Sequence, residues 1–127
     1  MAKIEGTCRE VLENAEWMAL LTFGKNTPHM VATWGEFLRR MGIEGEHIAV
    51  PVAWMHTTTE NLEKNEAIEV LVASKSVEAR HGYGQGCRIK GYAQLATGGA
   101  YAERAKELFP WARGALVIHV HKIETLL

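Results

Sequence analysis

The chain has 127 residues, of which 47% are hydrophobic and 23% charged, and its formal net charge is −1 at pH 7. These values exclude a disordered chain and fit one ordinary globular unit, so we expect a single domain over residues 1–127. Basic residues are never more clustered than the pair Arg39-Arg40, and no apolar run is long enough to span a bilayer, so we expect a cytoplasmic protein without nucleic-acid or membrane partners.

In chain order, the pattern predicts six strands separated by three short helices and several turns. Capping signals followed by amphipathic or Pro-terminated runs predict helices over residues 7–14, 57–65 and 100–109. Apolar or alternating runs predict strands over residues 17–23, 29–34, 46–53, 67–75, 86–97 and 115–122. Turns are expected at residues 24–28 and 42–45, and a glycine-rich loop at residues 77–86. Closely spaced strands with few helices indicate a mainly β fold, an antiparallel barrel or sandwich.

Three consecutive threonines follow the third predicted strand, in the stretch VPVAWMHTTTENL (residues 50–62). Thr57 and Glu60 have the spacing of a capping box, for which one hydroxyl suffices. Thr58 and Thr59 add two hydroxyls at a helix N-terminus, where unpaired amides and the helix dipole favour an anion. Helix capping and an anion pocket both remain open at this point.

Other polar clusters in the sequence give weaker signals. His119 and His121 alternate on the last predicted strand and face the same way, but a metal site needs a third ligand, so we predict solvent-facing histidines and no metal. Cys8 and Cys87 lack the spacing of a metal or redox motif and are expected as free thiols. The sequence GYGQG precedes a strand, whereas a dinucleotide fingerprint opens a helix, so it is weak support for a nucleotide site.

Three further stretches make a family resemblance visible: TPHMVATW (residues 27–34), VPVAWMHTTTENL (residues 50–62) and FPWARGALVI (residues 109–118). Together they closely resemble the small FMN-binding proteins of the split-barrel superfamily, to which pyridoxamine 5′-phosphate oxidase also belongs. The similarity continues through residues 74–91 and 125–127. It implies a six-stranded antiparallel split β-barrel with short peripheral helices, a homodimer, and one FMN per subunit at or near the dimer interface.

The same resemblance implies a set of FMN-binding residues. The phosphate is expected against three hydroxyl residues, Thr33, Thr57 and Thr58. The flavin ring is expected along the backbone of Val52, Ala53, Trp54, Met55 and His56. Aromatic residues expected to flank the ring are Trp34, Phe37 and Trp111. A last contact, from the partner subunit, is expected from Leu127.

Two positions depart from the family pattern. Thr57 stands where relatives commonly have a Lys or Arg that pairs with the phosphate, so the charge comes from Lys64, Lys75 or Arg88, or binding rests on neutral donors and is weaker. Trp54 stands where a close relative has a small residue, and it either stacks on the flavin or narrows the pocket.

The resemblance favours a flavoprotein in which FMN performs redox chemistry or electron transfer with an unknown redox partner. No residue is an obvious acid or base for substrate turnover, although His56 is a candidate proton donor to the reduced flavin. Two alternatives remain. One is a flavin- or deazaflavin-dependent oxidase or reductase of the same superfamily, and the other is a haem-binding or cofactor-free binding module.

Overall fold

The structure is a computed structural model that describes residues 2–24 and 27–127 of the chain. Its strands are β1 (Trp17–Thr22), β2 (His29–Trp34), β3 (His47–Val52), β4 (Ala67–Ala79), β5 (Gly82–Ala96) and β6 (Gly114–Thr125). Its helices are α1 (Gly6–Asn14), α2 (Gly35–Met41), α3 (His56–Lys64) and α4 (Ala100–Leu108). Within the described residues, no helix is long and apolar enough to cross a bilayer.

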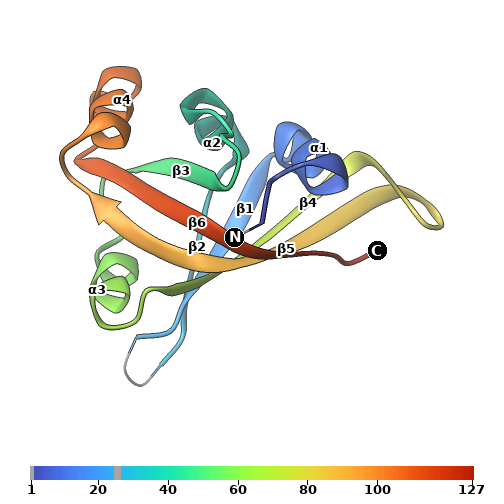
Figure 1. The fold of residues 1–127 in the computed structure, drawn as a ribbon, viewed down its shortest axis with the longest axis horizontal. Helices are drawn as coiled ribbons and strands as arrows, with labels where there is room; N and C mark the ends of the chain where they lie inside the picture. The colour runs from blue at the N-terminus through green and yellow to red at the C-terminus, as the bar shows by residue number, and fades with distance from the viewer. Residues whose placement is uncertain (1, 25–26) are drawn as a thin grey trace.

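All six strands form one antiparallel sheet in the order β2-β1-β4-β5-β6-β3. The sheet is strongly curved, and α1, α2 and α4 lie in a row along one side of it while α3 lies across from them (Figure 1). The edge strands β2 and β3 are not paired with each other and are linked in sequence by α2. This open, curled sheet confirms the expected six-stranded split barrel.

The core lies inside the curve of the sheet, because one face of each strand is apolar. On β4, Ile68, Val70 and Val72 are buried and the residues between them are more exposed. Five strands and three helices contribute to the same cluster, and the sequence pattern of period two accounts for the strand positions. The amphipathic helix α1 buries Cys8 and Leu12, as its sequence predicts.

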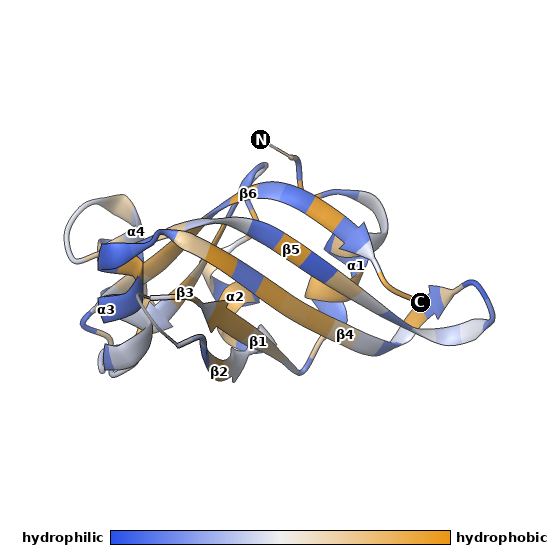
Figure 2. Cartoon of the chain, turned by 90° about the horizontal axis from the view of Figure 1, so that it is seen from below, coloured by the Kyte–Doolittle hydropathy of each residue, from blue (hydrophilic) through white to orange (hydrophobic). Residues whose placement is uncertain are grey.

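The outer face of β2, β1 and β4 is also largely apolar. Trp17 pairs with Trp34 across β1 and β2, and Ala19 of β1 pairs with Leu71 of β4, so these side chains share a face. Trp17, Trp34 and Leu71 are each about half exposed. Figure 2 shows hydrophobic residues along much of β1 and β4.

Helix α2 was not among the predicted elements. Its seven residues, GEFLRRM, have no side-chain cap, so little in the local sequence predicts a helix. Tertiary contacts hold it instead: Gly35 lies against the carbonyl oxygen of Ala15, and Arg39 donates to the carbonyl oxygens of Leu12 (3.2 Å) and Ala15 (2.6 Å).

Both capping-box predictions are wrong. Helix α1 begins at Gly6, with Glu5 as its cap residue and no side-chain capping bond, so Thr7 already lies within the helix. Helix α3 begins at His56 and Thr57 lies in its first turn, again without a side-chain cap. Both helices start two residues earlier than N-caps at Thr7 and Thr57 would place them, so the threonine hydroxyls at α3 are not used as helix caps.

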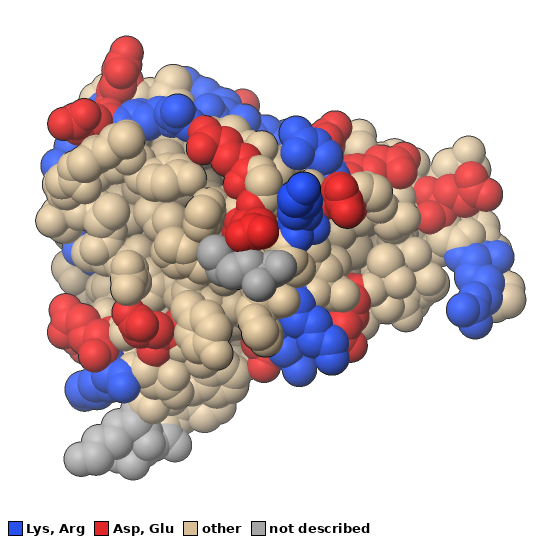
Figure 3. Space-filling model, viewed as in Figure 1, with Lys and Arg blue, Asp and Glu red and all other residues tan. Residues whose placement is uncertain are grey.

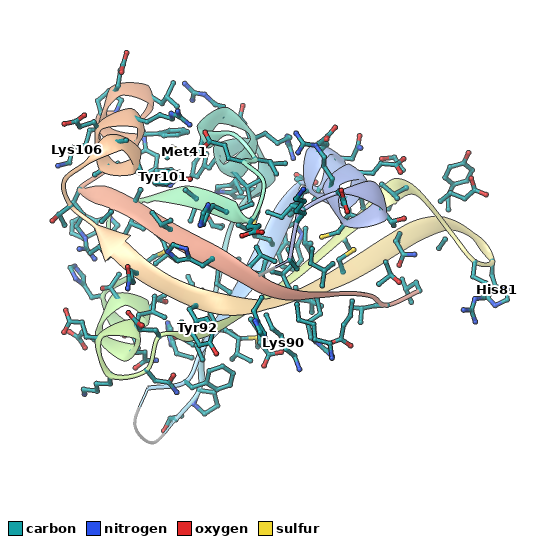
Figure 4. The ribbon with its side chains drawn as sticks, viewed as in Figure 1. Met41, His81, Lys90, Tyr92, Tyr101 and Lys106 are labelled. Atoms are coloured by element: carbon teal, nitrogen blue, oxygen red, sulfur yellow. The ribbon has the colours of Figure 1, made fainter. Side chains whose placement is uncertain are left out.

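The predicted loop at residues 77–86 is also wrong, because β4 and β5 continue through it and form a long hairpin. The register shifts between Ser74 and Glu78, and Gly82 and Gly84 have positive φ angles that a glycine adopts without strain. His81 lies at the tip of this hairpin (Figure 4). The predicted turn at residues 24–28 includes residues 25 and 26, which lie outside the described residues.

Candidate functional site

The chain makes an unusual turn between β3 and α3. Met55, the cap residue of α3, has φ 49° and ψ 40°, and no other non-glycine residue in the described ranges has a positive φ. The left-handed conformation costs an L-residue roughly 1–2 kcal/mol. Contacts from elsewhere in the fold must therefore hold this turn, and it determines the direction in which α3 begins.

Arg113, just before β6, supplies those contacts. Its Nε donates to the carbonyl oxygen of Ala53 (2.8 Å), and its Nη2 donates to the carbonyl oxygen of Trp54 (2.7 Å) and to Thr59 Oγ1 (3.2 Å). Its backbone amide donates to the carbonyl oxygen of Val52 (2.8 Å). Sequence reasoning missed Arg113 as a site residue, because its partners lie more than fifty positions earlier in the chain.

The first turn of α3 presents donors that have no acceptor. The first amide of the helix with a backbone acceptor is that of Thr59, which donates to the carbonyl oxygen of Met55 (2.9 Å), so the amides of residues 56–58 have no acceptor among the described residues. Thr58 is fully buried and its Oγ1 has no hydrogen-bond partner among the described residues. Thr57 is exposed, and Thr59 Oγ1 donates to the carbonyl oxygen of Met55 (3.0 Å). Free amides, a free buried hydroxyl and the positive end of the helix dipole together suit an anion.

Three aromatic rings, from α2 and from the segment between α4 and β6, form a cluster. The ring centroids of Phe37 and Phe109 are 5.0 Å apart, and Trp111 lies 5.5 Å from Phe37 and 5.4 Å from Phe109. Trp111 is half exposed, and it lies two residues from Arg113. The cluster therefore offers a partly exposed aromatic surface, and its link to the turn runs through the short chain segment from Trp111 to Arg113.

The remaining predicted site residues are distributed as follows. Thr33 is buried near the end of β2, and Trp34 follows it with a half-exposed ring. Trp54 is 77% exposed, so its ring projects from the turn rather than filling the interior, and it lies 6.0 Å from the ring of His56. The backbone of residues 52–56 forms one continuous segment from β3 into α3.

Leu127 lies apart from the start of α3 within one chain. The C-terminus and α3 are well separated along the longest axis of the molecule (Figure 1). Gln85 holds Leu127 through two backbone contacts of 2.9 Å, and the side chain lines an apolar groove of about 360 Å³ with Trp17 and Leu71. The structure thus brings Thr57 and Thr58 together at the start of α3, and Phe37 and Trp111 together in the aromatic cluster, and it leaves Leu127 on the outer face of the sheet.

None of the three cations considered for the phosphate contacts the first turn of α3 within the chain. Lys64 lies in the last turn of α3, at the opposite end of that helix. Arg88 lies 3.7 Å from Glu69, and Lys75 lines the groove that holds Leu127. On the face seen in Figure 3, acidic and basic residues are interspersed rather than gathered by sign.

His119, His121 and the two cysteines lie on other elements than this turn. His119 faces His47 on β3, with ring centroids 4.6 Å apart, and His121 packs near Tyr92. The described ranges contain no group of three or more His, Cys, Asp or Glu side chains placed to hold a metal. Cys8 and Cys87 are free and buried, and the hydrogen bond between them, together with burial, raises the pKa of the Cys8 thiol.

Comparison with known proteins identifies the family to which this chain belongs. Residues 4–126 match the family model described as pyridoxamine 5′-phosphate oxidase. The chain belongs to the pyridoxamine 5′-phosphate oxidase family. Among curated relatives of this family, it is 40% identical over 124 residues to an FMN-binding protein of Nitratidesulfovibrio vulgaris strain Miyazaki F, covering 98% of this chain and 99% of that one. The resemblance to the small FMN-binding split barrels is therefore confirmed.

Solved structures agree on the fold of the family. A HupZ variant of Group A Streptococcus superposes with a TM-score of 0.77 at 22% identity, covering 97% of this chain and 99% of that one. An FMN-binding protein of Syntrophomonas wolfei superposes with a TM-score of 0.58 at 20% identity, covering 94% and 88%.

Proposed function

We propose that the protein is an FMN-binding flavoprotein whose cofactor phosphate binds at the N-terminus of α3. The unpartnered, buried hydroxyl of Thr58 carries this proposal, because an unpaired buried donor costs stability unless a ligand completes it. The free amides of residues 56–58 add further donors toward the same anion. The FMN-binding relative, which is 40% identical over nearly the whole chain, supports the choice of cofactor.

The residues around the turn suit the remainder of an FMN molecule. Bound FMN would supply the redox chemistry, while the protein supplies position and access. The backbone of residues 52–56 has amides and carbonyls for the polar edge of the flavin. Trp111 and Phe37 would lie beside its planar ring, with Trp34 from the end of β2, since aromatic faces stack well on such rings. Thr33 is proposed as a further phosphate contact.

We propose that the protein works as a homodimer. Trp17, Met30, Trp34 and Leu71 are exposed on adjacent strands that share one face of the sheet, and contiguous apolar surface of this kind marks an interface. Leu127, 68% exposed on the same side, would then reach the flavin of the partner subunit. A dimer by light scattering at micromolar concentration is expected, and a monomer would remove the role of Leu127.

Within the redox class, we propose electron transfer or flavin carriage rather than a dedicated oxidase. His56 is exposed at the start of α3 and is our candidate proton donor, but no carboxylate hydrogen-bonds to it within the described ranges to make an acid–base pair. A protein or small molecule that donates or accepts electrons is then the required partner. Two buried free thiols fit a reducing compartment, which supports a cytoplasmic location.

The first experiment is to purify the protein without added cofactor, record its visible spectrum, and identify by mass what heat releases. A flavin spectrum with released FMN is expected. A Soret band would instead indicate haem, and a colourless protein that fails to take up FMN would indicate a cofactor-free module. If flavin is present, reduction by NAD(P)H or reduced deazaflavin F420 would distinguish an enzyme from an electron carrier.

A further inference from the structure

We propose that Arg113 is a positioning residue of the anion site at α3. This inference rests on the proposed FMN-binding function. Arg113 does not belong to the first turn of α3, yet its guanidinium contacts both sides of the turn that starts this helix. It holds Met55 in its left-handed conformation. In this way it orients the free amides of residues 56–58 and the Thr58 hydroxyl toward the proposed anion site.

The hydrogen bonds of Arg113 span the whole turn. Two of them end on the consecutive carbonyl oxygens of Ala53 and Trp54, which directly precede Met55. A third ends on Thr59 Oγ1, whose own hydroxyl donates to the Met55 carbonyl oxygen. Met55 is thus bracketed on both sides by groups that the same guanidinium holds. A left-handed residue without such support would relax to a commoner conformation and redirect the start of the helix.

The geometry requires an arginine rather than any cation. Three donors in one rigid plane reach two carbonyl oxygens and one hydroxyl at distances of 2.7–3.2 Å. An ammonium group on a flexible stem has no such fork and would hold one of these acceptors well at most. Charge alone is therefore not equivalent to the arginine.

Arg113 is also free of acidic partners. It is half buried, and no carboxylate lies within 4.0 Å of it in the described part of the chain. Its contacts with two carbonyl oxygens and one hydroxyl occupy Nε and Nη2 without neutralising its charge. Thr57 itself carries no positive charge. The guanidinium of Arg113, which has no acidic partner, therefore provides positive charge close to a helix end that already favours an anion.

The test compares FMN with riboflavin, which lacks the phosphate, in titrations followed by flavin fluorescence. In the wild type, the ratio of the riboflavin Kd to the FMN Kd measures the phosphate contribution. We expect Arg113→Met to reduce this ratio about tenfold or more, the order expected for losing hydrogen bonds from a charged group. Arg113→Lys should reduce it similarly, because lysine keeps the charge but not the fork.

A second variant tests whether Arg113 acts through the conformation of the turn. Glycine adopts the left-handed conformation without cost, so Met55→Gly in the Arg113→Met background should recover part of the lost ratio. Arg104→Met is the matched control, since Arg104 also donates to a backbone carbonyl, that of Met41 (2.7 Å), but lies on α4. It should leave the ratio unchanged, and circular dichroism should confirm that each variant is folded.

The outcomes separate this inference from the proposed function. If the wild type binds neither FMN nor riboflavin, the proposed function fails and the inference falls with it. If the wild type prefers FMN but Arg113→Met keeps the same ratio, only the role of Arg113 is refuted. Recovery of the ratio by Arg113→Lys would overturn positioning in favour of charge, and absence of recovery by Met55→Gly would contradict the role of the turn.

Discussion

Replacing Thr58 by valine should stabilise the protein without FMN and at the same time weaken FMN binding. Thr58 is fully buried and its hydroxyl has no hydrogen-bond partner in the described ranges. Valine closely matches threonine in shape but buries a methyl group in place of the unpaired hydroxyl. The two effects have opposite signs because the hydroxyl is unfavourable when the site is empty and favourable when a phosphate accepts its hydrogen bond.

The magnitudes follow from the burial of the hydroxyl. An unsatisfied buried hydroxyl costs about 1–3 kcal/mol, which sets the range of the stabilisation expected from Thr58→Val. For a chain of 127 residues the unfolding entropy is roughly 0.27 kcal/mol per kelvin, so the lower end corresponds to a Tm increase of about 4 °C. Losing a hydrogen bond to a charged phosphate should weaken FMN binding by about 10- to 100-fold.

The assay combines thermal unfolding of the FMN-free protein with FMN titration. Thr59→Val is the matched control, because Thr59 Oγ1 is bonded to the Met55 carbonyl oxygen and to Arg113, so its loss should lower Tm. A lower Tm for FMN-free Thr58→Val would show that the Thr58 hydroxyl is satisfied after all. An unchanged FMN affinity in that variant would show that the hydroxyl does not face the phosphate.

Three further predictions concern the interface, the packing of α2 and a surface ion pair. Leu71→Arg places a charge in the middle of the apolar outer face and should give a folded monomer, measured by light scattering and circular dichroism. Gly35→Ala should lower the unfolding free energy by about 1–3 kcal/mol in denaturant titration, because the added methyl group would collide with the Ala15 carbonyl oxygen. Arg104 holds the pKa of Glu44 below its usual value, so this pair stabilises the fold at neutral pH and the effect is lost as the pH falls through the lowered pKa. Glu44→Gln should therefore lower Tm slightly at about pH 7, and this difference should shrink as the pH falls through the lowered pKa of Glu44.

The strands were predictable from sequence because they show either alternating burial, as on β4, or a continuous apolar run, as on β3, where residues 48–52 are all buried. The same physics explains the misses. Helix α2 is held by Gly35 against a distant carbonyl and by Arg39 bonds to residues more than twenty positions earlier, and neither contact leaves a local signal. The extension of the β4–β5 hairpin was not predicted because glycines are typical of loops. Here Gly82 and Gly84 occupy strand positions with positive φ.

The candidate site likewise contains residues that the sequence predicts and one, Arg113, that it does not. Residues 52–58 are contiguous, so a resemblance over one short stretch identifies them together. Arg113 stands inside a recognised stretch, FPWARGALVI, but its role depends on carbonyl groups that any sequence has, so no residue type marks the partners. The cap predicted at Thr57 failed because a left-handed Met55 starts the helix earlier than a hydroxyl cap would.

Three costly features therefore meet in one short region: a left-handed Met55, a buried hydroxyl without a partner at Thr58, and a half-buried guanidinium without a carboxylate at Arg113. The first two each cost roughly 1–3 kcal/mol, a substantial fraction of the stability of a domain this size. A fold that needed only to pack its core would have no reason to place them together, since a helix cap or a salt bridge would relieve each one. The proposed phosphate at the start of α3 would give all three a common purpose, because it would accept hydrogen bonds from the hydroxyl and from the amides that the turn directs, and it would balance the positive charge beside them.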